Sequence, residues 1–487
     1  RSRYVQAVLS AIVPGLGHLV AGRGRLALIF GLPVVLLAAA LVVLVATTDR
    51  VRLAATLVQS EVIWGLLALQ FAILAWRLLA VASSLLDPAL SRPGRRDALP
   101  IALLLVAIVA PQAYAGYLTN VARETSDQIF VEETGSGGAW QPSLPPSPSP
   151  SPGVTPSVGP GPSVAPSPTS AVERITGLIV GVDAGAGRRT YLTDTMIVVS
   201  LDPLTETVSM LSIPRDMVDV PLPDGRVFPG KINGLVSYAR RNPDEFPGAD
   251  GTGRDVLMGA LGTLLGVRID YYALVHLGGF VRVVDTVGGV DVYVERGFCD
   301  PSYDQYGFSA GFSIRAGWHH LDGEQALAYA RVRKAAGESD FTRAARQQEV
   351  LSAIRDAIVR GGFLNDPVGL LRALGETIQT NVPREMLPDL AEVGSRIARD
   401  RTYRAVIRHP LVRSGSDARG YILVPDVEAI RGLVAAIFPL AGTMPVAARQ
   451  APQPETPKPS GGLSSGVGGC RPATPSPTSR GTRRPTA

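Results

Sequence analysis

Two aspartates lie where two candidate strands meet the loop between them. Asp183 follows the apolar run 178–182, and Asp194 precedes the run 195–201. If these strands are neighbours in one sheet, the two carboxylates converge and offer the oxygen ligands that Mg²⁺ prefers, with water and substrate phosphates completing its shell. The competing interpretation is that each aspartate caps a loop and binds no metal. The spacing alone leaves both interpretations open.

An arginine follows a third candidate strand in the run Ser-Ile-Pro-Arg-Asp at 212–216. The planar guanidinium of Arg215 is suited to two simultaneous hydrogen bonds with phosphate oxygens, and Asp216 is placed to orient it. An ion pair between these two residues without any ligand fits the sequence equally well. Lys231 is a further candidate cation, although a single lysine is usually just solvated.

The densest basic segment runs from 331 to 346, where Glu338 and Asp340 are the only acidic residues. Its cations are Arg331, Arg333, Lys334, Arg343 and Arg346. Arg343, Arg346 and Gln347 would share one face of a helix that opens at residue 341. Because a helix N-terminus attracts anions, this pattern predicts a site for several phosphate oxygens. The alternative is a solvated helix face.

Other common catalytic signatures are missing. The sequence contains no Walker-type phosphate loop and no zinc-protease motif. The net charge of +5 does not indicate a nucleic-acid partner, because many of the arginines flank apolar segments or lie in the C-terminal tail. The chemistry is therefore expected from the arginines and aspartates.

These residues fall within a region, 172–440, that alternates short β-branched runs with helical patterns. The strands are predicted at 175–182, 195–201, 208–213, 272–275 and 290–294. The helices are predicted at 253–265, 279–287, 322–331, 341–360 and 426–437. This alternation is typical of an α/β domain with a helix-covered sheet.

Three apolar segments before this region are long enough to cross a bilayer as helices, at about 26–46, 53–76 and 98–118. Pro14 and Gly15 interrupt the apolar stretch 4–20, which favours an interfacial or re-entrant helix; a fourth span is the alternative. Arginines precede the first span and follow the second. The positive-inside rule therefore predicts a multi-pass cell-membrane protein with everything after about residue 118 outside. Because the chain begins with Arg1, we also expect an upstream cytoplasmic segment.

Two segments have the composition of unfolded chain. Pro and Ser fill 19 of the 30 positions from 141 to 170, so 131–171 is assigned to a linker. At about 3.1 Å per residue such a linker can lift a domain on the order of 100 Å from the membrane, or it can be a passive connection. The tail, 441–487, is predicted to be disordered. Cys299 and Cys470 both fall on the predicted outer side, where a disulfide between them can form.

Taken in order, a series of motifs closely resembles those of the LytR-CpsA-Psr family. They are Gly-Val-Asp at 181–183, Thr-Asp-Thr at 193–195, Ser-Ile-Pro-Arg-Asp at 212–216, Lys-Ile-Asn at 231–233, Val-Gly-Gly-Val-Asp at 287–291, Leu-Asp-Gly-Glu-Gln-Ala-Leu at 321–327, Arg-Val-Arg at 331–333, and the segment 339–348, which begins Ser-Asp-Phe and ends Arg-Gln-Gln. The resemblance covers about 172–440 and looks closest to actinobacterial members.

The resemblance implies a catalytic domain in which helices flank a mixed sheet, with a long apolar pocket for a polyprenyl chain and a charged mouth for its pyrophosphate. It implies a phosphotransferase that moves a glycopolymer from a polyprenyl-pyrophosphate carrier to peptidoglycan. Teichoic acid, capsular polysaccharide and arabinogalactan are the candidate polymers.

By motif matching, Asp183 and Asp194 correspond to the family's Mg²⁺-associated aspartates. The residues matched to pyrophosphate contacts are Arg215, Arg331, Arg333, Arg343 and Gln347, and Lys231 is added for its charge. Catalysis is assigned to Arg215, Arg331, Arg333 and Asp340, the last as a candidate general base beside substrate-assisted and metal-bound routes. Many members carry an arginine two residues before the second aspartate. This chain has Leu192 there, which leaves Arg188 or Arg189 as substitutes.

The expected reaction is attack by an acceptor hydroxyl, the muramic acid 6-hydroxyl, on the glycan-proximal phosphorus, with release of polyprenyl monophosphate. Positioning and charge neutralisation supply most of the catalysis in such reactions. Two alternatives from other functional classes stay open. One is a non-catalytic membrane regulator that senses a polymer, and the other is a polyprenyl-pyrophosphate phosphatase that needs no acceptor.

Overall fold

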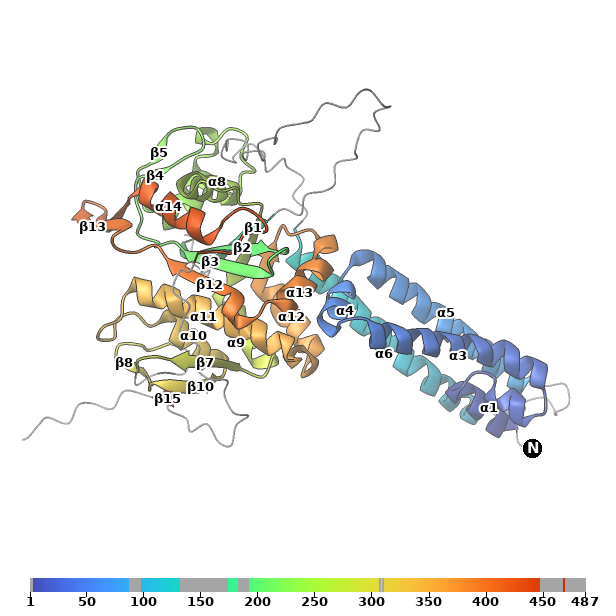
Figure 1. Ribbon diagram of the computed structural model, residues 1–487. Helices are drawn as coiled ribbons and strands as arrows, with labels where there is room; N and C mark the ends of the chain where they lie inside the picture. Colours follow the sequence, from blue (N-terminus) through green and yellow to red (C-terminus); the bar gives the residue numbers. More distant parts are fainter. Residues whose placement is uncertain are drawn as a thin grey trace, which may run out of the picture.

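The computed structural model describes residues 3–86, 98–131, 174–182, 192–305, 308, 311–446 and 467–468. Figure 1 shows an elongated bundle of helices at the N-terminus, with one end against an α/β domain. The bundle contains α1 (Arg3–Ile12), α2 (Leu16–Val20), α3 (Gly24–Thr47), α4 (Arg50–Thr56), α5 (Ser60–Leu85) and α6 (Ala98–Ile129). Three of these, α3, α5 and α6, are long and apolar enough to cross a membrane.

The second predicted span is displaced along the chain. Residues 50–56 form the separate helix α4, because the Asp49 side chain accepts hydrogen bonds from Val51 N and Arg52 N and so caps a new helix. The long helix begins only at Ser60 and continues past residue 76. Arg77 therefore lies inside α5, where its Nη2 donates to the carbonyl oxygen of Ala11 at 2.7 Å.

The N-terminal stretch is interrupted where Pro14 and Gly15 predict a break. Gly15 has φ of 93°, and a Cβ there would lie 2.5 Å from the Ala27 carbonyl oxygen, so this turn requires glycine. The break separates α1 from α2 and lets α1 pack along α5.

The centre of the α/β domain is a six-stranded mixed sheet of order β11-β6-β1-β2-β3-β12. Its strands are β1 (Ile175–Val182), β2 (Thr193–Asp202), β3 (Thr207–Ser212), β6 (Tyr271–His276), β11 (Ile378–Thr380) and β12 (Thr402–Val406). β1 is antiparallel to β2 and parallel to β6, and β3 is antiparallel to β2 and parallel to β12. The predicted strands in this sheet agree with β1, β2, β3 and β6 to within two residues.

Helices cover both faces of this sheet (Figure 1). On one side lie α7 (Leu235–Arg241), α8 (Arg254–Leu265) and α14 (Val427–Ile437), whose apolar residues form the main core with alternate residues of β1. On the other side lie α9 (Leu277–Thr286), α10 (Gly323–Arg331) and α11 (Asp340–Val359). The buried Gln348 side chain of α11 donates to Ser212 Oγ at 2.9 Å and to the Ala405 carbonyl at 2.8 Å, which fixes α11 to the ends of β3 and β12.

Smaller sheets surround these layers. They are β4 (Val220–Pro221) with β5 (Val227–Phe228), β7 (Val290–Val294) with β10 (Gly317–Leu321), β13 (Val412–Asp417) with β14 (Gly420–Pro425), and β8 (Phe298–Asp300) with β9 (Phe312–Ile314) and β15 (Val467–Gly468). The sequence pattern did not predict α7, α12 (Pro367–Thr377) or α13 (Leu387–Arg396). Of these, α12 and α13 face the helical bundle.

The prediction of a disordered C-terminal tail does not hold for Val467 and Gly468. Val467 and Gly468 pair with Ile314 and Ser313 of β9, so this part of the tail adds a strand to a sheet. Cys299 of β8, in the same sheet, is disulfide-bonded, while Cys470 lies outside the described residues.

Candidate functional site

The candidate site begins where β1 ends and β2 starts. Val182 pairs with Thr193, the residue before Asp194, across a register irregularity in the ladder. The predicted neighbours β1 and β2 are therefore adjacent. Asp183, Arg188 and Arg189 lie outside the described residues, so the pairing of Asp183 with Asp194 stays a prediction.

The loop that carries Arg215 is held on two sides. Ile232 N donates to the Met217 carbonyl at 2.8 Å, and Val218 N donates to the Leu423 carbonyl of β14 at 3.0 Å. This loop brings Arg215 Nη1 to 2.9 Å from Asp194 Oδ1. The loop therefore positions the arginine against the start of β2.

Asp216 links Arg215 to Lys231, as the sequence allowed. Arg215 Nε lies 3.5 Å from Asp216 Oδ2, and Lys231 Nζ donates to Asp216 Oδ1 at 2.7 Å. Because Asp216 and Lys231 pair with each other, their charges largely cancel. Lys231 therefore contacts Asp216, and only Asp216 of these two residues contacts Arg215.

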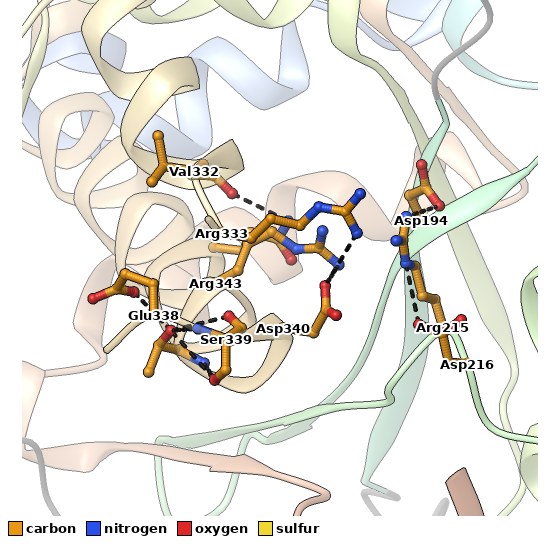
Figure 2. Close-up of polar contacts among 12 residues, drawn as sticks. Asp194, Arg215, Asp216, Val332, Arg333, Glu338, Ser339, Asp340 and Arg343 are labelled. Atoms are coloured by element: carbon orange, nitrogen blue, oxygen red, sulfur yellow. Dashed lines mark hydrogen bonds and ion pairs between the residues drawn. The ribbon is translucent and has the colours of Figure 1, made fainter. Parts of the chain in front are cut away.

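The N-terminus of α11 supplies the opposite wall. Ser339 is its N-cap and forms a capping box with Thr342, so Asp340 is the first helical residue. Arg343 Nη2 lies 2.9 Å from Asp340 Oδ1, and Arg333 Nη1 lies 3.7 Å from the same oxygen. Figure 2 shows the side chains of Arg333 and Arg343 directed past Asp340 toward Arg215 and Asp194.

We refer to Arg215, Arg333 and Arg343 as the arginine cluster. Burial alone would lower the pKa of Arg215, but the carboxylates of Asp194, Asp340 and Asp216 outweigh burial and raise it. Arg343 behaves differently. Burial lowers the pKa of Arg343, Asp340 offsets this only in part, and the like charges of Arg215 and Arg333 lower it further.

The cluster also has unused hydrogen-bond donors. Within the described part of the chain, the buried Nε atoms of Arg215 and Arg343 have no hydrogen-bond acceptor. Buried donors are rarely left without a partner. Arg215 Nε still lies 3.5 Å from the Asp216 carboxylate, and the buried Nε of Arg346, outside the cluster, also has no acceptor. The gathering of three guanidinium groups beside Asp194 and Asp340 is what forms a site that an anion would complete.

One prediction about α11 is wrong. Arg346 does not share the ligand face of Arg343, because its side chain is buried and bonds the carbonyls of Tyr329 and Val332 and the carboxylate of Glu338. Its guanidinium also stacks 4.6 Å over the Phe298 ring. Arg346 therefore holds α10 and α11 together and takes no part in the cluster.

The other predicted residues lie at the α10–α11 junction. Gln347 Nε2 donates to the Ala330 carbonyl at 3.4 Å, so this side chain contacts the end of α10. Arg331 is the last residue of α10, two positions before Arg333. The roles of Gln347 and Arg331 in pyrophosphate binding remain predictions.

An apolar cavity reaches the residue that precedes Asp194. Its lining includes Leu178, Val180 and Leu274 of the sheet, Leu257 of α8, and Thr193, the residue before Asp194. Its volume is about 10 Å³, roughly the space of one water molecule. A polyprenyl chain does not fit a cavity of this size, so the long pocket that the resemblance implies stays a prediction.

Arg254 was not predicted as a site residue. It lines this cavity, and its guanidinium lies 4.7 Å over the Tyr272 ring. A sequence signal exists, since Arg254 begins a helix whose following residues are almost all apolar. The signal is weak, because a single arginine before an apolar run does not by itself indicate a ligand site.

Of the two aspartates predicted to bind Mg²⁺, only Asp194 lies within the described residues. Among the described residues, no group of three or more His, Cys, Asp or Glu side chains is placed to hold a metal. Asp194 is 34% exposed, and one of its two oxygens bonds Arg215. Mg²⁺ commonly takes one or two carboxylates and completes its shell with water and phosphates, so a single open carboxylate beside a phosphate site fits this ion.

Comparison with known proteins gives a consistent picture. Residues 159–423, more than half of the chain, match the model of the LytR_cpsA_psr family. The polyisoprenyl-teichoic acid–peptidoglycan teichoic acid transferase TagU of Halalkalibacterium halodurans is 29% identical over 215 residues, 44% of this chain and 62% of that protein. The corresponding transferase TagV of Bacillus subtilis is 34% identical over 190 residues, 39% of this chain and 44% of that protein.

The chain thus spans less than two thirds of the length of these curated relatives. Among solved structures, the crystal structure of Bacillus subtilis TagV has a TM-score of 0.43 and 27% identity, covering 54% of this chain and 97% of that one.

Proposed function

Because this chain belongs to the LytR_cpsA_psr family, we propose that it transfers a glycopolymer from a polyprenyl-pyrophosphate carrier to peptidoglycan. The observation that carries the proposal is the arginine cluster, in which Arg215, Arg333 and Arg343 come from three separate segments and gather around Asp194 and Asp340. An apolar cavity reaches Thr193, the residue before Asp194. A pyrophosphate with a lipid tail has the matching chemistry, since its phosphates suit guanidinium groups and its tail suits an apolar cavity.

In this proposal the cluster binds the pyrophosphate, with Lys231, Arg331 and Gln347 at its periphery. The Nε donors of Arg215 and Arg343 would then gain phosphate oxygens as acceptors. Mg²⁺, held by Asp194 and by Asp183, would neutralise part of the pyrophosphate charge when bound. Transfer of this kind depends mostly on positioning and charge stabilisation, which the arginines provide.

The reaction forms a bond between an acceptor hydroxyl oxygen of peptidoglycan, the muramic acid 6-hydroxyl, and the glycan-proximal phosphorus. The bond from that phosphorus to the bridging oxygen breaks, and polyprenyl monophosphate leaves with the electron pair. Asp340 is the candidate acceptor of the hydroxyl proton, because its carboxylate lies at the cluster, between Arg343 and Arg333. The same position also lets it orient both arginines.

We place this reaction outside the cell membrane, with α3, α5 and α6 as a multi-pass anchor. The three apolar helices indicate membrane anchoring, and the arginines around the first two spans favour an outer location for the catalytic domain.

The test is turnover by the purified full-length chain with Mg²⁺, a polyprenyl-pyrophosphate glycan and peptidoglycan oligomers, followed by mass spectrometry. We expect linked glycan–peptidoglycan product, with polyprenyl phosphate release that depends on the acceptor. Equal release with and without acceptor, and no linked product, would instead identify a phosphatase. Stoichiometric binding without any turnover would identify a polymer sensor.

Arg343→Ala tests the cluster itself. Loss of a preorganised charge contact in a transition state typically reduces the rate on the order of 100-fold or more, so we expect at least such a loss of transfer. Arg360→Ala is the matched control at the C-cap of the same helix, because Arg360 is half exposed and pairs with Asp291. Full transfer by Arg343→Ala would remove the cluster from the mechanism.

Asp340 is tested by separating its two roles. If it only orients the arginines, Asp340→Asn should mainly raise KM for the lipid substrate. If it accepts the proton, the same change should mainly lower kcat at saturating substrate.

A further inference from the structure

The last membrane-spanning helix is longer than a bilayer requires. α6 has 32 residues, about 48 Å at 1.5 Å per residue, against a hydrocarbon core of about 30 Å. Its final turns carry polar residues, and Thr125 and Ser126 among them are buried by protein. This end of α6 packs against α12 of the outer domain.

The contact between α6 and α12 is close. A Cβ on Gly375 of α12 would lie 2.8 Å from Thr125 Cγ2 and 3.0 Å from Gln128 Oε1. Nearer the span, Arg372 Nη2 of α12 donates to the Tyr117 hydroxyl of α6. The two helices therefore meet over several turns, with a glycine where they are nearest.

The residues after α6 extend the central sheet. Phe130 forms a parallel bridge with Thr380 of the edge strand β11, and Val131 N donates to the Thr380 carbonyl at 3.0 Å. Exposed edge strands normally need protection. Here the end of the anchor covers the β11 edge.

Charged groups complete the contact. Arg384, whose side chain is only 14% exposed, donates to Asp127 at 2.9 Å and lies 5.5 Å over the Phe130 ring. Arg52 of α4 pairs with Asp389 and Glu392 of α13. The basic end of α4 thus matches the acidic face of α13.

These contacts contradict the expected use of the Pro/Ser-rich segment as a spacer of about 100 Å. Residues 132–173 join Val131, at the β11 edge, to Arg174, which precedes β1, and only β6 separates these two strands. Neighbouring strands lie about 4.8 Å apart. The segment is therefore many times longer than the gap that it closes, and it does not set the height of the domain.

We propose that the face formed by α12, α13 and β11 is a docking surface for this chain's own anchor, specifically α4 and the end of α6. The outer domain then works as one body with the membrane helices and meets its acceptor at a fixed height. The docking itself does not depend on the proposed function. The fixed height at which the domain meets its acceptor rests on the proposed function, because only a transferase has such an acceptor.

Docking also fixes the direction of the site. β12 begins at Thr402, shortly after the docked α13, and ends at Val406, which pairs with Ser212 just before the Arg215 loop. The arginine cluster therefore lies at the opposite end of the sheet from the α4–α13 contact. In Figure 1, β13, which follows β12, is far from the bundle.

The test is a disulfide between Thr125→Cys and Gly375→Cys in the full-length chain in native membranes, with a protease site inserted between 132 and 173. The sulfur introduced by Thr125→Cys would take about the place of Thr125 Cγ2, within bonding geometry of a Cβ at 375. After cleavage, we expect the two fragments to stay joined on a non-reducing gel. The control pair is Thr125→Cys with Gly415→Cys on the distant β13 hairpin.

A docked domain should cross-link at least about 10-fold faster than the control pair, because docking raises the local concentration. Equal rates would overturn the proposal. A second measurement needs no cysteine: after cleavage of the otherwise wild-type chain in detergent, the outer fragment should co-elute with the anchor fragment. Immediate separation of the outer fragment from the anchor fragment after cleavage would also overturn the proposal.

Charge reversal identifies the contacts responsible. Arg52→Glu with Arg384→Glu should release the cleaved outer fragment. Combining Arg52→Glu with Asp389→Arg and Glu392→Arg should restore co-elution relative to Arg52→Glu alone. If the outer fragment is released to the same extent in the wild type and in all these variants, these ion pairs do not hold the domain on the anchor.

Discussion

Arg343 and Arg346 are three residues apart on α11 and have opposite environments. Arg343 faces Asp340, Arg215 and Arg333 and keeps an orphaned Nε. Arg346 is enclosed by backbone carbonyls, Glu338 and the Phe298 ring. The buried Nε of Arg346 also has no hydrogen-bond acceptor, so the two arginines differ in their Nη atoms. Those of Arg346 already donate to the carbonyls of Tyr329 and Val332 and to Glu338, whereas those of Arg343 face the arginine cluster.

We expect Arg346→Met to destabilise the protein by about 3–5 kcal/mol, because it leaves the buried Glu338 carboxylate without its cation. Thermal or urea unfolding of the full-length chain in detergent measures this. Arg360→Met, which removes a half-exposed ion pair, should cost less than about 1 kcal/mol. Similar losses in the two variants would contradict the structural role of Arg346, and Arg346→Met with Glu338→Gln should recover part of the stability.

Much of the site is predictable at this scale. Arg215, Arg333, Asp340 and Arg343 stand in motifs with characteristic order, and the structure brings them together with Asp194. Arg346 was misassigned because helical spacing says which residues share a face but not which face packs against α10. That information is in the tertiary packing.

At the scale of elements, the first turn of α8 contains a carboxyl with an unusual pKa. Burial raises the pKa of Asp255 from 3.8 to about 6, and the Asp250 carboxylate adds to the effect despite backbone hydrogen bonds that oppose it. The folded protein therefore holds this proton to a higher pH than the unfolded chain does. The stabilisation is complete below about pH 4 and is lost as the pH rises through about 6.

Asp255→Asn should remove this dependence. We expect the free energy of unfolding of the wild type, relative to that of the variant, to fall by about 1–3 kcal/mol between about pH 4 and pH 7, since one pKa unit corresponds to about 1.4 kcal/mol. Unfolding curves of both proteins at several pH values provide the measurement. A constant or rising difference would show that the Asp255 pKa is not raised.

The packing of α9 against α12 gives another prediction. A Cβ on Gly279 would lie 1.8 Å from Thr377 Oγ1 and 3.1 Å from Thr377 Cα, so Gly279→Ala must push the helices apart at a cost of about 1–3 kcal/mol. Gly278→Ala is the neighbouring control, because its Cβ would meet nothing within 4 Å. The control should be neutral or stabilising by up to about 1 kcal/mol. Equal effects on the unfolding midpoint would refute the close approach.

The predictability of elements follows their length and periodicity only in part. β1 and β2 are long and apolar, α8 is apolar, and α10 and α14 are amphipathic, so the sequence locates them within a few residues. α11 was located as well, although it has no clear apolar face. α12 and α13 are about as long as α10 and α14, and both are amphipathic, so the sequence carried a signal for them that the prediction missed. Their apolar residues pack partly against the anchor and not only against the domain core. The displaced second span has a local cause: Asp49 caps the start of α4, and residues 57–59 separate α4 from α5.

At the scale of the whole molecule, composition predicts the separate parts but not their arrangement. The Pro/Ser-rich segment has the composition of a spacer, yet the domain and the anchor are in contact through residues scattered from Arg52 to Glu392. No local pattern marks such residues, because each looks like an ordinary surface charge. The arrangement depends on charge and shape complementarity between distant segments.

The central claim is that the arginine cluster holds the pyrophosphate of a lipid whose chain enters the neighbouring cavity. Mass spectrometry of the lipid that co-purifies with the full-length chain tests this most directly, with Arg343→Ala and Arg333→Ala purified in parallel. We predict a polyprenyl pyrophosphate, bare or carrying a glycan, bound to the wild type and depleted in both variants. Absence of any polyprenyl phosphate from the wild type, or equal amounts in all three proteins, would contradict the account.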